Sequence, residues 1–181
     1  MKAPEVRVLA GRWKGRRLEA GFATRPTSSR ARLALFNILG PRIAGARVLD
    51  LYAGSGAIGI EAVSRGAESA VLVETDAGPL QRSVERIGAA SGELRVVSGT
   101  VRAAIEDFAR RGDRFDLVFA DPPYASDAAG GDLDGSPGLL GDGGLFVLQQ
   151  DEGQAAPLLA GLTALDRRDY GRNVFLFYGM R

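Results

Sequence analysis

Between residues 46 and 150 the apolar positions of the chain alternate between two patterns. Short apolar runs predict buried strands, and the segments between the first four runs carry apolar residues three or four positions apart, which predicts amphipathic helices. The strands are expected at 46–52, 69–75, 94–98, 115–120 and 144–150, and the helices at 57–66, 77–90 and 101–111. Because parallel strands need helical crossovers, the pattern predicts an α/β fold with a doubly wound, mostly parallel sheet.

The residues before this alternation predict an extension of a different kind. Two short stretches, 6–9 and 16–19, flank a glycine-bounded turn and predict a β-hairpin. The segment RPTSSRARLALFNILG then predicts a helix that Thr27 or Ser28 caps and Gly40-Pro41 ends. Its expected apolar stripe consists of Leu33, Phe36, Ile38 and Leu39. We therefore expect two parts, a hairpin-and-helix extension at 1–45 and the α/β domain at 46–181.

The last third of the chain is less regular. The segment NVFLFYG at 173–179 predicts a closing strand. Residues 126–143 are rich in Gly and Asp, which predicts a partly disordered loop.

Composition restricts the chemistry. The chain has 181 residues, enough for one well-filled domain, and contains neither cysteine nor histidine. Disulfides, thiolate nucleophiles, histidine bases and the common metal ligands are thereby excluded, and we expect no metal site. No apolar run approaches the roughly 20 residues that span a bilayer, and the first residues lack the apolar core of a signal peptide. We expect a cytoplasmic protein without a membrane partner.

The charges are divided along the chain. Residues 1–47 contain 11 Lys and Arg but only two Glu, whereas the remaining residues contain 12 basic and 20 acidic side chains. This asymmetry predicts a polyanion-binding extension on a less basic body. The alternative is a solvated edge hairpin whose charges prevent strand addition. The side chains that would face phosphates are Arg7, Arg12, Lys14, Arg16, Arg17, Arg25, Arg30 and Arg32.

The first candidate motif is DLYAGSGAIG, residues 50–59, at a predicted junction of strand and helix. Its spacing, Gly54-x-Gly56-x-x-Gly59, matches a dinucleotide fingerprint, because glycines allow a tight turn and close approach of a ligand. Asp50 changes this interpretation, since an acid at the strand end suits a cationic ligand better than a pyrophosphate. S-adenosylmethionine carries a sulfonium and an ammonium and no phosphate. The alternative for Asp50 is a helix-capping or turn-forming acid.

A second acid follows at the end of the next predicted strand. Glu74 stands 18 residues after Gly56, where a carboxylate can accept hydrogen bonds from both ribose hydroxyls. Nicotinamide and methionine cofactors share this feature, so Glu74 does not separate them. The alternative is a surface acid that merely follows a strand.

The motif FADPPYA, residues 119–125, ends the fourth predicted strand of the α/β domain. In a doubly wound sheet, the carboxyl end of this strand borders the ligand crevice. Asp121 and the carbonyl of Pro122 can accept hydrogen bonds from an exocyclic amine, and Tyr124 can stack on a base. The prolines stiffen these groups into a near-attack geometry. This arrangement predicts methyl transfer to an amine, the alternative being a proline-rich turn with a chance acid.

DPPY together with DLYAGSG resembles the class I S-adenosylmethionine-dependent amine methyltransferases. Four further segments, RVLAGRWKGRRL, RPTSSRARLALFNIL, LDLYAGSGAIGIEAVSRGA and DYGRNVFLFY, resemble the bacterial small-subunit ribosomal RNA guanine-N2 methyltransferases. The resemblance covers nearly the whole chain. It implies a seven-stranded sheet, S-adenosylmethionine as cofactor, and methyl transfer to the N2 amine of a guanine in small-subunit ribosomal RNA, within an assembled or assembling subunit. We expect a monomer.

The resemblance and the motifs together assign three groups of residues. We expect catalysis from Asp121, Pro122 and Tyr124. Cofactor binding is expected from Asp50, Tyr52, Ala53, Gly54, Ser55, Gly56, Glu74, Thr75, Thr100, Val101 and Asp121. RNA binding is expected from Arg12, Lys14, Arg16, Arg17, Arg25, Pro26, Thr27, Arg30 and Pro123.

The chain departs from the family pattern at several positions. Where the family has an acid, it has Thr27-Ser28-Ser29, and Leu33 replaces a glutamate. Thr100 stands where the family often has Asp or Asn on the adenine amine, and we expect it to accept that hydrogen bond. The Gly- and Asp-rich 126–143 replaces a helix, and we expect a lid that orders on RNA. Gln149 and Gln150 replace an acid and are interpreted as structural.

Other functions share parts of this pattern. A DNA adenine or protein glutamine methyltransferase would use nearly the same site. A nicotinamide oxidoreductase fits the glycine spacing but leaves DPPY unexplained. Methylation at pyrimidine carbon-5 is disfavoured by the lack of cysteine. A non-catalytic RNA-binding module with the same fold is the alternative from another class.

Overall fold

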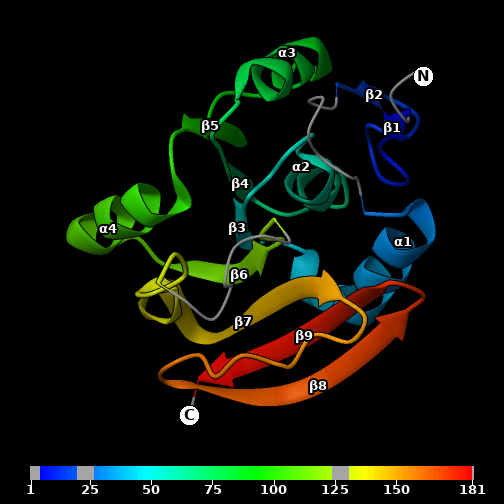
Figure 1. The fold of residues 1–181 in the computed structure, drawn as a ribbon. Coiled ribbons are helices and arrows are strands. Elements are labelled where there is room, and N and C mark those ends of the chain that lie inside the picture. The colour runs from blue at the N-terminus through cyan, green and yellow to red at the C-terminus, as the bar shows by residue number, and fades with distance from the viewer. Residues whose placement is uncertain (1–4, 20–26, 124–130, 181) are drawn as a thin grey trace.

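The computed structural model describes residues 5–19, 27–123 and 131–180. A seven-stranded sheet in the order β5-β4-β3-β6-β7-β9-β8 forms its centre (Figure 1). The first five strands in this order pair in parallel, and β9 pairs antiparallel with both β7 and β8. The predicted doubly wound, mostly parallel α/β fold is confirmed. The strands are β3 (Arg47–Leu51), β4 (Ser69–Glu74), β5 (Leu94–Ser98), β6 (Phe115–Ala120), β7 (Leu140–Asp151), β8 (Leu162–Tyr170) and β9 (Asn173–Met180).

Helices cover both faces of the sheet. One core joins the sheet to α1 (Ser29–Leu39), α2 (Ala57–Ser64) and α3 (Gly78–Ile87), and it also includes the N-terminal strands β1 (Val6–Arg7) and β2 (Arg17–Leu18). The other core joins the opposite face to α4 (Val101–Arg111) and to the 3-10 turn η2 (Ser136–Leu139). Figure 1 shows α1, α2 and the hairpin together, with α4 on the other side of the sheet. The inner parallel strands β3, β4 and β6 are thus buried between two layers, whereas the edge strand β5 is only partly covered.

Two parts of the C-terminal third differ from prediction. Residues 131–143, expected within a disordered loop, contain η2 and the start of β7, because Leu133, Leu139 and Leu140 are buried against α4. The strand β8 was not predicted. It forms an exposed edge whose consecutive charges pair with one another, so no apolar alternation marks it in the sequence.

The helix α1 forms as predicted but buries a different stripe. The side chain of Ser28 caps it by accepting a hydrogen bond from the Ala31 N–H at 3.2 Å. Leu33 and Ile38, expected in the core, are 46% and 38% exposed. The buried positions instead are Ala31, Arg32, Leu35, Phe36 and Leu39. An arginine occupies a core position here because it has a buried acid as partner.

That acid, Glu61 in α2, also holds the N-terminal hairpin. Its carboxylate accepts hydrogen bonds from the N–H groups of Leu9 at 2.6 Å and Ala10 at 2.9 Å. One turn later, Ser64 Oγ accepts from the Trp13 N–H at 3.0 Å and donates to the Ala10 carbonyl at 2.6 Å. The hairpin therefore packs against the C-terminal end of α2.

Within the described residues, no helix is long and apolar enough to cross a membrane.

Candidate active site

The candidate site lies where the order of strands reverses. The chain runs from β3 to β4 on one side, whereas β6 pairs with β3 on the other. The carboxyl ends of β3 and β6 lie side by side, since Leu51 is opposite Ala120 and the Asp121 N–H reaches the Leu51 carbonyl at 3.4 Å. In open α/β sheets, this reversal point is where ligands bind. The two sequence motifs, separated by some 70 residues, meet there.

Asp50 is buried inside the end of β3. Its side chain is 1% exposed, and Oδ2 accepts a hydrogen bond from the Gly59 N–H in the first turn of α2 at 2.9 Å. The pKa of Asp50 is raised from 3.8 to about 7, mainly by burial; the Gly59 hydrogen bond lowers it, and the nearby Glu74 carboxylate adds to the rise. Asp50 thus orients the start of α2, as the capping alternative predicted, while its buried carboxyl favours a cationic neighbour.

The glycine-rich turn between β3 and α2 has a backbone that requires glycine. Gly56 takes φ 74 at the N-cap of α2, and a Cβ there would lie 2.5 Å from Leu80 Cδ1. A Cβ on Gly59 would lie 2.1 Å from Leu72 Cδ2, so α2 packs directly on β4. Tyr52 has φ 60, the one positive φ among the described non-glycine residues. The turn follows the end of β3 directly, and its glycines leave the backbone uncovered by side chains there.

Glu74 reaches back to this turn from the end of β4. Its Oε2 accepts from the Gly54 N–H at 2.7 Å, and its Oε1 accepts from the N–H groups of Thr75 at 2.9 Å and Asp76 at 3.2 Å. These bonds fix the carboxylate beside the glycine-rich turn. The acid is therefore not an isolated surface residue.

The remaining predicted cofactor residues lie around this turn and at the ends of β4 and β5. Ser55 is buried, and the Ala53 N–H donates to the Val73 carbonyl at 2.9 Å. Thr100 caps α4, its hydroxyl oxygen accepting from the Ala103 N–H at 3.3 Å, and Val101, the first residue of α4, is buried in the core on this face of the sheet. The predicted adenine-binding hydroxyl of Thr100 thus has a structural partner.

Tyr52 contacts the segment that follows the DPPY motif. Burial, then the carboxylate of Asp132, raises the pKa of the Tyr52 phenol to about 12. The phenol therefore stays protonated and can donate a hydrogen bond at neutral pH.

Asp121 follows the last residue of β6. Its pKa is raised from 3.8 to about 7, first by burial and then by the charges of Asp50 and Asp151, while the nearby Thr27 hydroxyl acts in the opposite direction. Two carboxyl groups with raised pKa values, Asp50 and Asp121, thus lie close enough for their charges to interact. Such perturbed groups beside a ligand crevice are typical of functional sites.

Gln149, interpreted from the sequence as structural, contacts this carboxylate. Its Nε2 donates to Asp121 Oδ2 at 3.1 Å, and its Oε1 accepts from the Thr27 hydroxyl at 2.9 Å. The Thr27 hydroxyl, predicted to contact RNA, thus points into the site. Gln150 agrees with the structural interpretation, since its amide donates to the Gln154 carbonyl at 2.7 Å. The signal that would have found Gln149 is its place in β7, one residue past the position that pairs with the last residue of β6.

Some of the residues predicted to contact RNA form ion pairs within the protein, and others are exposed. Arg12 forms an ion pair with Glu93 at 2.6 Å and stacks over the Trp13 ring at 4.2 Å. Arg17 pairs with Glu5 at 2.5 Å, as does Arg7 at 2.7 Å. Among the described residues, Lys14, Arg16 and Arg30 are exposed and have no recorded ion pair.

Arg32 was expected to face phosphates, and this prediction was wrong. Its side chain is 1% exposed, and its Nη2 donates to the Arg7 carbonyl. Burial lowers its pKa, with the Glu61 charge acting in the opposite direction.

Several predicted residues lie outside the described ranges: Tyr124, Arg25 and Pro26. Pro122 and Pro123 follow Asp121 directly, and both are at least partly exposed. Thr75, at the end of β4, is exposed as well.

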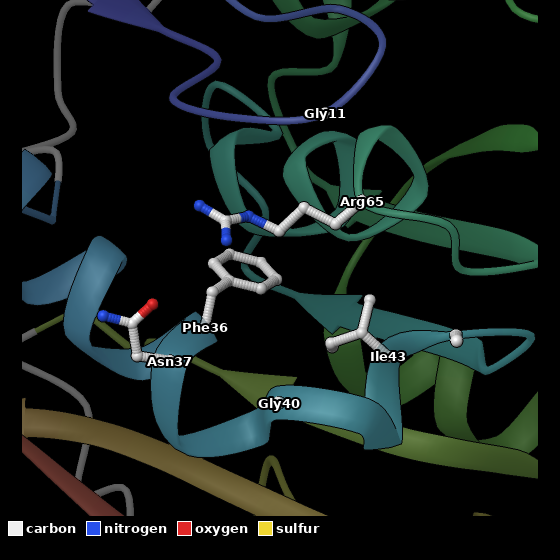
Figure 2. Close-up of a pocket in the computed structure, with 7 residues that line it drawn as sticks. Gly11, Phe36, Asn37, Gly40, Ile43 and Arg65 are labelled. Atoms are coloured by element: carbon white, nitrogen blue, oxygen red, sulfur yellow. The ribbon is translucent and has the colours of Figure 1, made fainter.

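A separate pocket of about 600 Å³ opens elsewhere on the molecule. It lies next to the residues that precede β3, at the opposite end of that strand from Asp50, and the Arg65 guanidinium lies over the Phe36 ring at 4.7 Å (Figure 2). The pocket contains none of the predicted catalytic or cofactor residues. Its lining residues are Gly11, Phe36, Asn37, Gly40, Ile43, Ala44 and Arg65.

Comparison with known proteins gives concordant matches. The model of a family described as conserved hypothetical protein 95 matches residues 6–179. The Ribosomal RNA small subunit methyltransferase D of Escherichia coli K12 is 39% identical over 123 residues, which cover 66% of this chain and 61% of that protein. The putative rRNA methyltransferase YlbH of Bacillus subtilis is 33% identical over 183 residues, covering 97% of this chain and 100% of that protein.

Solved structures agree with the fold. The putative methyltransferase yhhF from Escherichia coli superimposes with a TM-score of 0.81 at 31% identity, over 98% of both chains. The chain nevertheless spans only 61% of the length of the curated Escherichia coli relative that it matches.

Proposed function

The chain belongs to the family described as conserved hypothetical protein 95, and on this premise we propose that it methylates the N2 amine of a guanine in small-subunit ribosomal RNA. S-adenosylmethionine is the proposed methyl donor. The RNA is bound as part of an assembled or assembling small subunit, by a monomer. The relatives named as ribosomal RNA methyltransferases support the substrate class.

The observation that carries the proposal is the closeness of two acids, the buried Asp50 and the partly buried Asp121, at the reversal point of the sheet. Asp50 and Asp121 end neighbouring strands, and burial raises the pKa of each to about 7. A cation placed between them would favour their charged forms. The family and this charge arrangement together favour a sulfonium-bearing ligand over an anionic nicotinamide dinucleotide.

The residues present fit S-adenosylmethionine. The glycine-rich turn at 52–56 offers a close backbone approach, and Glu74 is held beside it, where a carboxylate suits ribose hydroxyls. Asp50 and Asp121 supply the negative charge that the sulfonium and ammonium groups need. Residues predicted from sequence to complete this binding surface are Tyr52, Ala53, Ser55, Thr75, Thr100 and Val101.

S-adenosylmethionine, when bound, supplies an electrophilic methyl group whose carbon–sulfur bond breaks with its electrons returning to sulfur. The guanine amine is a poor nucleophile because its lone pair is delocalised. Asp121 and the Pro122 carbonyl accept hydrogen bonds from the amine, which orient the lone pair and stabilise the positive charge that grows on nitrogen. With a pKa near 7, Asp121 can also take up the proton that nitrogen loses.

The base and its RNA are held by other parts of the chain. Tyr124 stacks on the guanine plane, a role that rests on the sequence because Tyr124 lies outside the described residues. Lys14, Arg16 and Arg30 are the exposed cations in the described extension that best suit phosphate contacts. Arg25, Pro26 and Pro123 remain predicted RNA contacts on sequence grounds.

The test is methyl transfer from labelled S-adenosylmethionine to small ribosomal subunits that lack the modification, followed by nucleoside digestion. We expect labelled N2-methylguanosine from the wild type and at least a 100-fold lower rate from Asp121→Asn, because one catalytic acceptor is worth about 10²–10⁴-fold. Cofactor binding by calorimetry should stay nearly intact. Asp116→Asn is the matched control, since Asp116 is an exposed acid at the other end of β6.

Other outcomes would replace the proposal. A labelled N6-methyladenosine in DNA or a labelled glutamine would indicate a different amine acceptor. Tight cofactor binding without transfer to any subunit, RNA or DNA would favour a non-catalytic module. Full activity in Asp121→Asn would refute the mechanism.

A further inference from the structure

Gln149 is the side chain that the structure adds to the candidate active site. The register of β6 and β7 places Ala120 opposite Leu148, so Asp121, the first residue after β6, lies beside Gln149, which is still within β7. The Gln149 side chain is buried, with 4% exposure. A buried amide needs hydrogen-bond partners within the protein, and the partly buried carboxyl of Asp121 supplies one.

The Gln149 amide is held by three partners from three parts of the fold. Nε2 donates to Asp121 Oδ2 at 3.1 Å and to Asn173 Oδ1, at the start of β9, at 3.3 Å. Oε1 accepts from the Thr27 hydroxyl, just before α1, at 2.9 Å. Because both the nitrogen and the oxygen of the amide have hydrogen-bond partners, the nitrogen is fixed toward Asp121.

We propose that Gln149 is a positioning residue for Asp121, holding Oδ2 so that Oδ1 accepts the hydrogen bond of the substrate amine. The inference rests on the proposed amine methylation. A carboxylate at a strand end has two rotatable bonds, and an amine attacks productively from only a narrow range of directions. One fixed donor on Oδ2 restricts that rotation.

The same contact affects the charge of Asp121. The acids Asp50 and Asp151 oppose its ionisation. The Gln149 N–H group is a neutral donor that stabilises the carboxylate form, and the proton of the Thr27 hydroxyl is directed to Gln149 Oε1. Gln149 therefore helps to keep Asp121 a hydrogen-bond acceptor near neutral pH.

The experiment compares Gln149→Leu with Gln150→Leu. Gln150 is the matched control because it is the same residue type, is buried at 8% exposure, and donates to the Gln154 carbonyl instead. Three quantities are measured: the pH dependence of kcat for RNA methylation, the affinity for S-adenosylmethionine, and the titration midpoint of Asp121. The midpoint comes from the carbon-13 shift of its carboxyl group, assigned with Asp121→Asn.

For Gln149→Leu we expect kcat to fall about tenfold or more, with the Asp121 midpoint and the acidic limb of the profile moving up by about one pH unit. Cofactor affinity should stay within about twofold, because Gln149 holds the acid rather than the cofactor. Gln149→Glu, which keeps the shape of the side chain, should raise the midpoint further, since a second carboxylate repels the first. This variant decides the matter if Gln149→Leu does not fold.

Two results would overturn the inference. One is a Gln149 variant whose kcat and Asp121 midpoint match those of Gln150→Leu. The other is a shifted midpoint with unchanged kcat, which would make the contact structural. If the wild type itself transfers no methyl group to RNA, the proposed substrate fails, and the Asp121 midpoint alone then decides whether Gln149 controls this carboxyl.

Discussion

Arg32 and Glu61 form a buried ion pair between α1 and α2, with 3.9 Å between Arg32 Nε and Glu61 Oε2. Neither side chain is more than 1% exposed. Arg65 is a second cation on the same acid, its Nε donating to Glu61 Oε1 at 2.8 Å. One carboxylate thus neutralises buried arginine charge and also binds the backbone of the N-terminal hairpin.

We expect Glu61→Ala to lower the free energy of unfolding by about 3–5 kcal/mol, because it leaves a buried guanidinium without a countercharge. It also leaves the N–H groups of Leu9 and Ala10 without their acceptor. Urea unfolding followed by circular dichroism measures the change. The hairpin should also become sensitive to proteolysis before the rest of the chain.

Glu19→Ala is the control for this prediction. Glu19 also bridges two arginines, Arg82 and Arg86, but on the surface, where the pairs are screened by solvent. Its loss should change stability far less than the loss of Glu61. If both substitutions lower the free energy of unfolding equally, burial of the Glu61 ion pair does not account for its contribution to stability.

Asp50 should make stability depend on pH. Its pKa is raised from 3.8 to about 7 in the folded chain, so between these values the folded state binds more protons than the unfolded state. The contribution of the protonated carboxyl is therefore complete below pH 4 and is lost as pH rises toward 7. Asp50→Asn has no carboxyl to ionise, so its stability should not fall in this range. The free energy of unfolding of Asp50→Asn minus that of wild type should therefore increase by on the order of 2–4 kcal/mol between pH 4 and pH 8.

Urea unfolding of both proteins at several pH values measures that difference. Asp116→Asn controls for removing a carboxylate from the sheet, since Asp116 is exposed and lies at the opposite end of the neighbouring strand β6. A stability difference for Asp50→Asn that does not vary with pH would mean that the carboxyl is not titrating in the folded protein.

Glu74→Ala should weaken binding of S-adenosylmethionine by about 1–3 kcal/mol, the usual cost of orphaned hydrogen-bond partners. The substitution also removes the acceptor for the Gly54 N–H, which loosens the glycine-rich turn. Calorimetric titration measures the affinity. Glu68→Ala, an exposed acid just before the other end of β4, should bind as the wild type does, and unaltered affinity in Glu74→Ala would place that residue outside the cofactor site.

Replacing both Lys14 and Arg16 by serine should weaken RNA binding and flatten its salt dependence. Each lost phosphate contact reduces the slope of log affinity against log salt by about 0.7–0.9. Arg110 and Arg111 in α4, on the opposite face of the sheet, provide a control with the same change of charge. If the slope of log affinity against log salt is the same in the two double variants, Lys14 and Arg16 do not contact RNA phosphates, and the hairpin is a charged, solvated edge.

The alternation of strands and helices between residues 46 and 120 and the place of the two acidic motifs followed from the sequence alone. Alternating apolar runs and amphipathic segments encode the parallel sheet locally, because each element buries its own face. Once the sheet is doubly wound, the ends of β3 and β6 must be neighbours, and Asp50 and Asp121 come together without further information.

The tertiary structure decided what depends on partners distant in the sequence. Arg32 is buried because Glu61 lies opposite it in α2, and β8 is a strand because β9 offers it a free backbone edge, although most of its side chains remain exposed. Gln149 joins the site because the register of β7 on β6 sets it beside Asp121, 28 residues away. Local patterns record which face of a segment is apolar, but only packing determines which polar groups meet.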